Sequence, residues 1–335
     1  MKAVQLRKPG GLDNLYVSDL AEPSPGAGEI LVRIHASSLN YHDYVVAKGG
    51  MAHAADGLIP MSDGAGVVVE VGAGVRSFKP GDAVVSTFFP DWEAGEPTAD
   101  KIRALPGDRN DGYACEQVVV PEHYFVKAPR GYSHAEAATL TCAGLTAWRA
   151  LVVEGGIKAG DTVLVQGTGG VSIFALQIAR MFGATVIATS SSEAKMARLK
   201  ELGADQVINY KTTPEWGREV ARLTGGRGVD HVVEIGGAGT LGESINACRL
   251  GGHISMIGVL AGFQGAVNTA QLMAKQIKLK GIMVGSRDDL KAMIRAVEAN
   301  SLKPVIDRSF PLEALADAFR YQESNAHFGK ICLEF

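Results

Sequence analysis

The sequence predicts an α/β protein that combines a doubly wound parallel sheet with a separate β-rich domain. A glycine-rich turn joins an apolar strand to an apolar helix within residues 162–182. Strands and helices then alternate strictly, as is typical of a parallel sheet covered on both faces. Short strands and turns fill the first 130 residues, with a spacing that fits a small, partly closed β-barrel.

The glycine turn runs Gly167-Thr168-Gly169-Gly170-Val171-Ser172. Such a turn before a helix aims backbone N–H groups and the helix dipole at one point, which suits a pyrophosphate. Ser172 stands where a third glycine is usual. We therefore expect phosphate contacts from the backbone of Thr168, Gly169, Gly170 and Val171.

The expected strands of the parallel sheet are 162–166, 185–189, 206–209, 231–235, 253–258 and 279–284. Helices are expected at about 171–182, 193–202, 215–224, 240–249 and 268–276. Ligands bind such sheets at the carboxyl ends of the strands, which puts Gly236, Gly258 and Val259 on the cofactor side.

Around this sheet the pattern predicts a helical segment at 133–153 and a polar loop at 90–111. The first domain is expected to hold strands at 3–6, 30–36, 66–71, 83–87 and 117–120. After the sheet come a helix (288–299), an extended run (304–310), a helix (312–322) and a strand (330–334).

The end of the second strand of the sheet bears on the choice of cofactor. NAD enzymes usually carry Asp or Glu there, to bind the ribose 2′-hydroxyl. This chain has Thr189 and three serines, then Glu193 and Lys195, with no carboxylate at the strand end itself. Hydroxyl groups and a lysine suit a 2′-phosphate, so we predict NADP(H). Ser192 also suits the N-cap of the following helix, and both roles are compatible.

Composition excludes several classes of protein. The 335 residues carry a net charge of −3, with no drive toward nucleic acid or anionic membranes. No apolar run reaches membrane-spanning length, and the N-terminal residues enter a strand pattern rather than a signal peptide. Four scattered cysteines suit a reducing compartment, so we expect a cytoplasmic protein.

Several segments together resemble the medium-chain dehydrogenase/reductase superfamily. Besides the glycine turn they are 25–33, 38–43, 63–72, 78–84, 141–148 and 202–210. The resemblance implies a GroES-like catalytic domain (1–130 and 286–335) interrupted by a Rossmann dinucleotide-binding domain (131–285). It also implies a homodimer or homotetramer, with 279–284 as a candidate edge strand for pairing.

The resemblance also bears on zinc. Zinc members of the superfamily carry Cys where this chain has Asn40, and His-Glu where it has Ser62 and Asp63. Cys142 stands at the third ligand position, but a catalytic zinc needs three protein ligands. Asn40 and Asp43 instead match the N-x-x-D of the quinone-oxidoreductase-like branch, so we expect no metal.

By the same resemblance, Asn40, Tyr41 and Asp43 are the candidate catalytic residues. Asn40 and Tyr41 are expected to face the nicotinamide, in a pocket between the two domains. The resemblance gives His42 no role and favours a surface position for it. The remaining cofactor candidates are Asn40, Thr146, Ser190, Lys195, Tyr210, Val284, Ser286 and Asn325.

Without a Lewis acid, hydride transfer needs an acceptor that is already electrophilic, such as a quinone or an α,β-unsaturated carbonyl. The sequence thus predicts an NADPH-dependent reductase of a small-molecule quinone or enone. Two alternatives stay open: an alcohol dehydrogenase-like enzyme of the same superfamily, and a protein that binds NADPH, or RNA, without catalysis. The proton donor is left unidentified.

Overall fold

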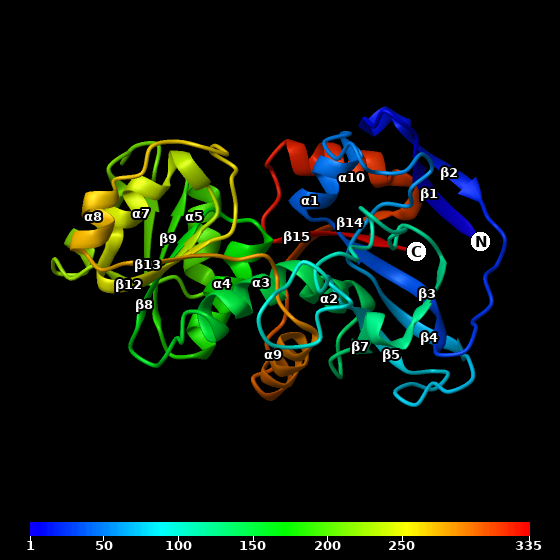
Figure 1. Ribbon diagram of the computed structural model, residues 1–335. Helices are drawn as coiled ribbons and strands as arrows, with labels where there is room; N and C mark the ends of the chain where they lie inside the picture. The colour runs from blue at the N-terminus through cyan, green and yellow to red at the C-terminus, as the bar shows by residue number, and fades with distance from the viewer. The chain divides into compact units, whose positions relative to one another are not determined.

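The computed structural model describes residues 1–335, which form two compact units. Unit 1 comprises residues 1–145 and 285–335, and unit 2 comprises residues 146–284. Figure 1 shows the helices and strands of both units.

Unit 2 contains a six-stranded sheet in the order β10-β9-β8-β11-β12-β13, with every pair parallel. This is the doubly wound order that the alternating pattern predicts, and β13 is an edge strand as expected. The bounds are β8 (Thr162–Gln166), β9 (Thr185–Ser190), β10 (Gln206–Asn209), β11 (Val229–Glu234), β12 (Cys248–Met256) and β13 (Lys278–Gly281).

Helices follow these strands as predicted. They are α4 (Gly170–Met181), α5 (Glu193–Glu201), α6 (Trp216–Leu223), η5 (Gly237–Gly239), α7 (Leu241–Ala247) and α8 (Thr269–Ala274). Trp216 of α6 and Ile245 of α7 are buried in one cluster with strand residues such as Leu164 and Val232. Burial of these side chains against the sheet supplies the main stabilisation of helices this short.

The predicted helix at 133–153 is interrupted. The structure has α2 (His134–Ala138), a π-helical turn η3 (Leu140–Gly144), α3 (Leu145–Trp148) and a second π-helical turn η4 (Arg149–Val153). Gly144 N donates to Thr139 O at 3.2 Å, and Glu154 N to Arg149 O at 2.9 Å, which are the five-residue bonds of π turns. Such turns are frequent at functional sites.

Unit 1 is built around a sheet in the order β14-β15-β3-β4-β5-β7, with β6 also paired to β3. The long strand β3 pairs with β6 along its first half and with β15 along its last residues. The strands are β3 (Glu29–Ser38), β4 (Ala65–Val71), β5 (Ala83–Ser86), β6 (Gln117–Pro121), β7 (Phe125–Lys127), β14 (Ile306–Pro311) and β15 (Lys330–Glu334).

The rest of unit 1 packs around this sheet. A separate hairpin pairs β1 (Lys2–Leu6) with β2 (Leu15–Asp19), a strand that the sequence pattern did not predict. Ile30, Val32 and Phe125 belong to one buried cluster, and Phe319 and Leu333 to another. The remaining elements are η1 (Leu12–Asn14), α1 (Tyr41–Ala47), η2 (Glu122–Tyr124), α9 (Arg287–Ala299), η6 (Leu312–Ala314) and α10 (Leu315–Glu323).

The domain boundary predicted after residue 130 differs from the boundary in the structure, where residues 131–145 belong to unit 1. Hydrogen bonds tie this segment to the sheet of unit 1. Ser38 Oγ donates to Ala138 O at 3.4 Å, and Thr141 Oγ1 donates to Ser86 O at 2.9 Å.

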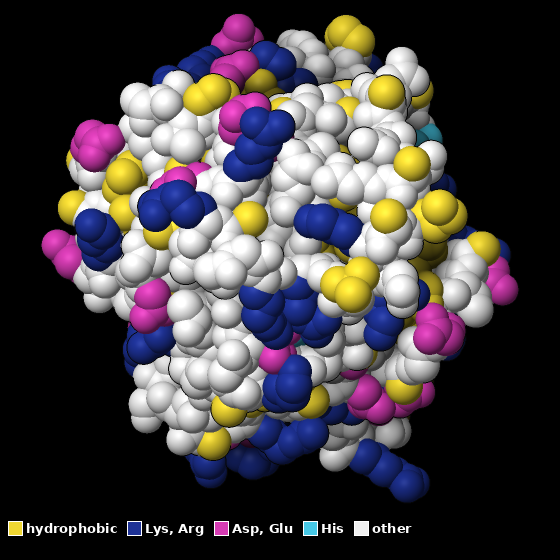
Figure 2. All heavy atoms as spheres, turned by 90° about the vertical axis from the view of Figure 1, so that its left-hand side faces the viewer, with side chains coloured by type: hydrophobic (Ala, Val, Ile, Leu, Met, Phe, Trp, Pro, Cys, Tyr) yellow, Lys and Arg dark blue, Asp and Glu magenta, His cyan; other side chains and the backbone are white.

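All four cysteines are free thiols. None of the helices combines the length and the apolar character that a membrane span requires. On the face drawn in Figure 2, positive and negative side chains are interspersed. The cytoplasmic location stays a prediction.

Candidate active site

The glycine turn of unit 2 has the conformation that a phosphate cradle needs. Gly167 has a φ of 70°, in the region that favours glycine, and turns the chain out of β8. Gly169 is the N-cap of α4, has no side-chain cap, and a Cβ there would meet nothing within 4 Å. The first N–H groups of α4 therefore lie beside open space, where an anion is favourable. This geometry fits the phosphate role predicted for Thr168, Gly169, Gly170 and Val171.

Ser172 has a structural role at the third glycine position. Its buried hydroxyl donates a hydrogen bond to Gln166 O at 2.6 Å. The bond ties the first turn of α4 to the end of β8. A serine thus joins helix and strand here, where the usual motif relies on close packing against glycine.

The three residues predicted for a 2′-phosphate lie at one edge of unit 2. Ser190 ends β9, Tyr210 follows β10, and Tyr210 N donates to Ser190 O at 3.1 Å. Lys195 is in the first turn of α5, where its N–H donates to Ser192 Oγ, so the predicted N-cap is confirmed. Glu193 also lies at this edge, and its carboxylate accepts a bond from Asn209 Nδ2 at 2.8 Å. The edge therefore carries both signs of charge.

A buried carboxylate organises the crevice loop after β11. Glu234 Oε1 accepts bonds from Gly236 N at 2.7 Å and from Gly237 N at 3.0 Å. Its Oε2 accepts from Gln166 Nε2 at 2.8 Å, which links this loop to the glycine turn. At the end of β12, a Cβ on Gly258 would lie 2.2 Å from Ile235 O. The loops that carry Gly236, Gly258 and Val259 are thus held close together, as the crevice prediction requires.

The remaining cofactor candidates occupy special backbone positions. Val284 is buried with a φ of 46°, which is costly for a β-branched residue and is typical of functional sites. Asn325 has a φ of 55° just after α10, a conformation that asparagine tolerates. Thr146 is buried in α3. Ser286 is the N-cap of α9, and its Oγ donates to Asp289 Oδ2 at 2.7 Å.

In unit 1, Asp43 fastens the start of α1 to the segment around Ser62. The Asp43 carboxylate accepts from Asn40 N and from Ser62 N, each at 2.9 Å. The two residues also bond through their side chains, because Asn40 Nδ2 donates to Ser62 Oγ at 3.2 Å. Complete burial raises the pKa of Asp43, against the opposing effect of the His42 charge and the two donors.

Lys330 is a site residue that the sequence argument missed. Its buried ammonium donates to Asn40 Oδ1 at 2.7 Å and to Leu39 O at 2.6 Å. It also lies 3.7 Å from Asp63 Oδ2. Because Oδ1 of Asn40 is taken by this lysine, the amide turns its N–H₂ donor side toward Ser62. The sequence gives little indication of this role, because Lys330 is a single lysine at the start of an apolar strand, 290 residues from Asn40.

Asp63 is buried at the same place. Its Oδ2 accepts from Ser38 Oγ at 2.5 Å, while its Oδ1 has no hydrogen-bond partner. Burial raises the pKa of Asp63 to about 7, although the Lys330 ammonium opposes the rise. Met61, two residues earlier, is buried with a φ of 81°, so this segment also carries backbone strain.

The residues at the family's zinc-ligand positions differ in chemistry from a catalytic zinc set. The family's first two ligand positions hold an amide and a hydroxyl that bond each other. Cys142 supplies one sulfur in the turn η3, and no group of three His, Cys, Asp or Glu side chains is suitably placed for a metal ion. The donor set therefore lacks the three strong ligands that a catalytic zinc needs.

The first turn of α1 presents two further side chains. Tyr41 is its first residue and is 45% exposed, so its ring is available to a ligand. His42 is not the surface residue that we expected. Its side chain is only 26% exposed, lies against Phe88, and has its Nε2 at 3.2 Å from Asp108 Oδ2.

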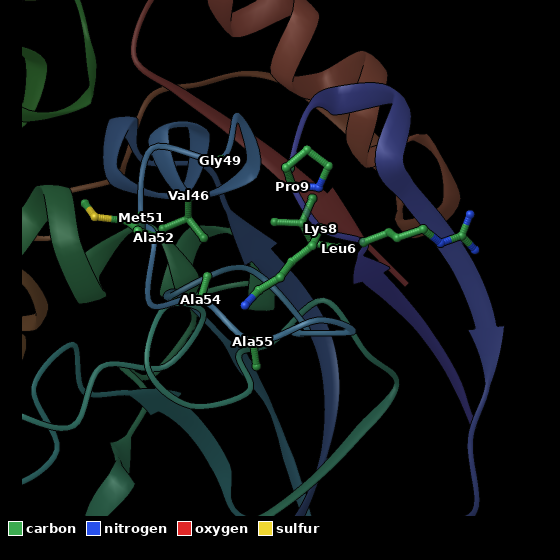
Figure 3. Close-up of a pocket in the computed structure, with 11 residues that line it drawn as sticks. Leu6, Lys8, Pro9, Val46, Gly49, Met51, Ala52, Ala54 and Ala55 are labelled. Carbon is green, nitrogen blue, oxygen red and sulfur yellow. The ribbon is translucent and has the colours of Figure 1, made fainter.

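A cavity of about 300 Å³ lies elsewhere in unit 1 (Figure 3). Leu6, Lys8 and Pro9 of the N-terminal segment line one side, and Val46 and Met51 line another. None of the candidate catalytic residues lines it. The cavity is thus separate from the residues predicted for catalysis.

Known proteins resemble this chain over its full length. Residues 26–130 match the alcohol dehydrogenase GroES-like domain family, and residues 170–299 match the zinc-binding dehydrogenase family. A zinc-type alcohol dehydrogenase-like protein of Schizosaccharomyces pombe is 41% identical over 97% of this chain and 96% of its own length. A chloroplast envelope quinone oxidoreductase homolog of Arabidopsis thaliana is 31% identical over 97% and 95%.

Solved structures agree in fold. A putative alcohol dehydrogenase from Sinorhizobium meliloti is 42% identical, with a TM-score of 0.93 and coverage of 100% of this chain and 99% of that one. Two others differ in the cofactor that they name. An NAD-dependent alcohol dehydrogenase is 39% identical (TM-score 0.92, both chains fully covered), and a crotonyl-CoA carboxylase/reductase in complex with NADP is 25% identical (TM-score 0.88, coverage 100% and 94%).

The GroES-like unit, the Rossmann sheet with its glycine turn, and these full-length relatives lead to one conclusion. The chain is an oxidoreductase of the medium-chain dehydrogenase/reductase superfamily.

Proposed function

We propose that this protein is an NADPH-dependent reductase of quinones or α,β-unsaturated carbonyls that works without zinc. One observation carries the proposal: Asn40 and Ser62, at two of the three zinc-ligand positions, bond to each other at 3.2 Å. An amide and a hydroxyl cannot replace thiolate and imidazole as zinc ligands. The acceptor must then be electrophilic without help from a metal.

Each unit contributes its own residues to the proposed reaction. In unit 2 the first turn of α4 would hold the cofactor phosphates, with Ser190, Lys195 and Tyr210 at the ribose. A bound NADPH supplies the hydride. In unit 1 the Asn40 amide, held by Lys330 and Ser62, would offer its second N–H to the oxygen on which negative charge develops. Tyr41 is a second donor candidate, and Asp43 holds the start of α1 in place.

The hydroxyl groups at the carboxyl end of β9, together with Lys195 in the first turn of α5, favour NADP(H) over NAD(H). Glu193 argues in the opposite direction, since its carboxylate would repel a 2′-phosphate. Similar proteins name both cofactors. The bond from Asn209 to Glu193 directs that carboxylate toward β10, which supports NADP(H) as the preferred cofactor.

An alcohol dehydrogenase activity is the second candidate, because similar proteins are named a zinc-type alcohol dehydrogenase-like protein and a putative alcohol dehydrogenase. A non-catalytic NADPH-binding role is a third. For assembly we propose a homodimer or homotetramer, in which the edge strand β13 is the pairing element.

A turnover screen separates these candidates. The purified protein is assayed with NADPH and NADH against benzoquinone, cyclohexenone and enoyl thioesters. Oxidation of primary and secondary alcohols is measured with NADP⁺ and NAD⁺, and zinc is measured in the same preparation. We expect kcat/KM for the best quinone or enone to exceed that for any alcohol by orders of magnitude, because metal polarisation is worth several kcal/mol.

Three outcomes would contradict the proposal. Faster oxidation of a plain alcohol would assign the protein to alcohol dehydrogenase chemistry. Stoichiometric zinc that resists a chelator would contradict the premise that the protein works without zinc. Cofactor binding without any turnover would favour the non-catalytic role.

A further inference from the structure

A buried carboxylate lies between two histidines in unit 1. Asp108 Oδ2 is 3.2 Å from His42 Nε2, and Asp108 Oδ1 contacts His53 Nε2. The Asp108 side chain is 5% exposed, that of His42 26% and that of His53 40%. The exposed fraction thus falls from His53 to the carboxylate and rises again at His42, beside the candidate residues of α1.

Three separate segments bring these side chains together. His42 is the second residue of α1, and His53 lies in the loop after that helix. Asp108 belongs to a turn closed by Gly107 N and Asn110 O at 2.8 Å. Next to this turn, Tyr113 N donates to Met61 O at 2.9 Å, which fastens the loop to the segment that precedes Ser62. The polar loop expected at 90–111 therefore delivers a carboxylate to the candidate site.

The electrostatics favour a charged His42. Burial acts to lower the pKa of His42, but Asp108 and Asp43 outweigh it and raise the pKa. Burial likewise opposes ionisation of Asp108, yet His42 and His53 hold its pKa below the usual value. Asp108 and Asp43 are the charged groups that act on His42, and Phe88 packs edge-on against the ring. Asp108 lies beside Nε2, so Nδ1 is the ring nitrogen that does not face this carboxylate.

We propose that His42 is the general acid that protonates the reduced acceptor, and that Asp108 keeps its imidazole charged and oriented. His53 covers the other oxygen of the carboxylate and lies between it and solvent. The inference rests on the proposed function, and it supplies the proton donor that the sequence did not identify.

An enone takes up a hydride and then a proton. Hydride addition at the β-carbon, with NADPH as the reductant, moves one electron pair onto the enolate. The Nδ1–H bond of His42 breaks, its electron pair stays on the imidazole, and the proton bonds to the α-carbon. Neutral His42 then regains a proton from solvent after the product leaves. Hydride transfer to a quinone, by contrast, gives a hydroquinone monoanion, which takes its one remaining proton on oxygen, where water supplies it readily.

This difference gives the test. His42→Asn is compared with wild type for NADPH-dependent reduction of cyclohexenone and of benzoquinone. His123→Asn is the matched control, because His123 pairs with Asp91 at 3.3 Å on the exposed surface of the same unit. We expect His42→Asn to lower kcat for the enone by about a hundredfold or more, a typical contribution of a general acid. The loss for the quinone should be much smaller, and His123→Asn should match wild type.

The pH profile provides a second readout. Wild-type enone reduction should decline at alkaline pH as His42 loses its proton. Asp108→Asn should move that decline to lower pH, because the carboxylate no longer stabilises the imidazolium. Cofactor Kd and the circular dichroism spectrum should stay unchanged in each variant. If His42→Asn fails to fold, the shift of the alkaline decline in Asp108→Asn still tests the role of His42.

Equal losses for quinone and enone, or an enone kcat within about threefold of wild type, would overturn the role of His42 while the proposed function stands. If enone reduction by Asp108→Asn declined at the same alkaline pH as in wild type, the role of His42 would also be overturned. If wild type reduces neither acceptor, the proposed function fails and the inference fails with it.

Discussion

Lys195 and Glu193 start the same helix with opposite charges, so the preference for NADP(H) depends on individual side chains. Both lie in the first turn of α5, next to the end of β9. Glu193 is bonded to Asn209 at 2.8 Å. A carboxylate held in this way is less able to occupy the place of a ribose 2′-hydroxyl partner. In the proposed cofactor assignment, Lys195 is the residue that distinguishes NADPH from NADH.

Lys195→Ala should weaken NADPH binding about tenfold or more and leave NADH binding nearly unchanged. A charge-assisted bond to phosphate is worth about 1.5–3 kcal/mol, and only NADPH carries the 2′-phosphate. Fluorescence titration of both cofactors measures the two Kd values. Lys200→Ala, on the same helix, is the control and should change neither. Equal losses for NADPH and NADH would remove the 2′-phosphate role of Lys195.

At the scale of elements, helix starts are where sequence and structure agree best. Ser192 caps α5 and Ser133 caps α2, each by accepting a backbone N–H three residues on. Ser286 does the same for α9, with Asp289 completing a capping box. The cap accounts for Ser286 without a cofactor, so the two roles need to be separated.

Ser286→Ala should lower the free energy of unfolding by about 0.5–2 kcal/mol, the usual cost of losing an N-cap. Urea unfolding measures this effect, and Ser133→Ala provides a comparison at a cap for which no cofactor role is expected. Cofactor titration of both variants completes the test. A Kd that rises for Ser286→Ala and not for Ser133→Ala would support the cofactor role that the resemblance implies.

The helix predicted at 133–153 shows the limit of local reasoning about elements. Its apolar pattern is helical throughout, but two π turns interrupt it. A π turn changes the hydrogen-bond partner by one residue, and side-chain periodicity barely records that change. The turns rotate the residues around Cys142 relative to an uninterrupted helix.

At the scale of the whole molecule, Asp63 should make stability depend on pH. Its pKa is raised by burial from 3.8 to about 7 in the folded protein, so the folded state binds the proton more tightly than the unfolded chain. The free energy of unfolding should therefore fall as pH rises from about 4 to about 7, by up to about 1.4 kcal/mol per pH unit from this group.

Asp63→Asn should flatten that decline, because the amide has no proton to lose. Urea unfolding across this pH range measures the slope for wild type and variant. Asp317→Asn, on the exposed surface of α10, is the control and should keep the wild-type slope. A variant whose slope equals that of wild type would show that Asp63 is not the group responsible.

The sequence by itself determined the Rossmann sheet and its glycine turn. Apolar runs of strand length alternate with helical patterns there, and neighbouring elements along the chain also pack together. The strands 162–166 and 206–209 have the predicted bounds, and β13 is the expected edge. The hydroxyl-rich carboxyl end of β9 and the helix cap at Ser192 could also be recognised in the sequence, because strand ends and helix caps are local features.

Only the tertiary structure brought together the polar cluster of unit 1. Lys330 reaches Asn40 across 290 positions, and Asp108 meets both His42 and His53 from a loop that has no periodic pattern. Such contacts leave no trace in hydrophobic periodicity, since each member is one polar residue in an otherwise ordinary segment. Folding then sets their chemistry: burial raises the pKa of Asp63 to about 7, and contact with Asp108 helps to raise the pKa of His42 against the effect of burial.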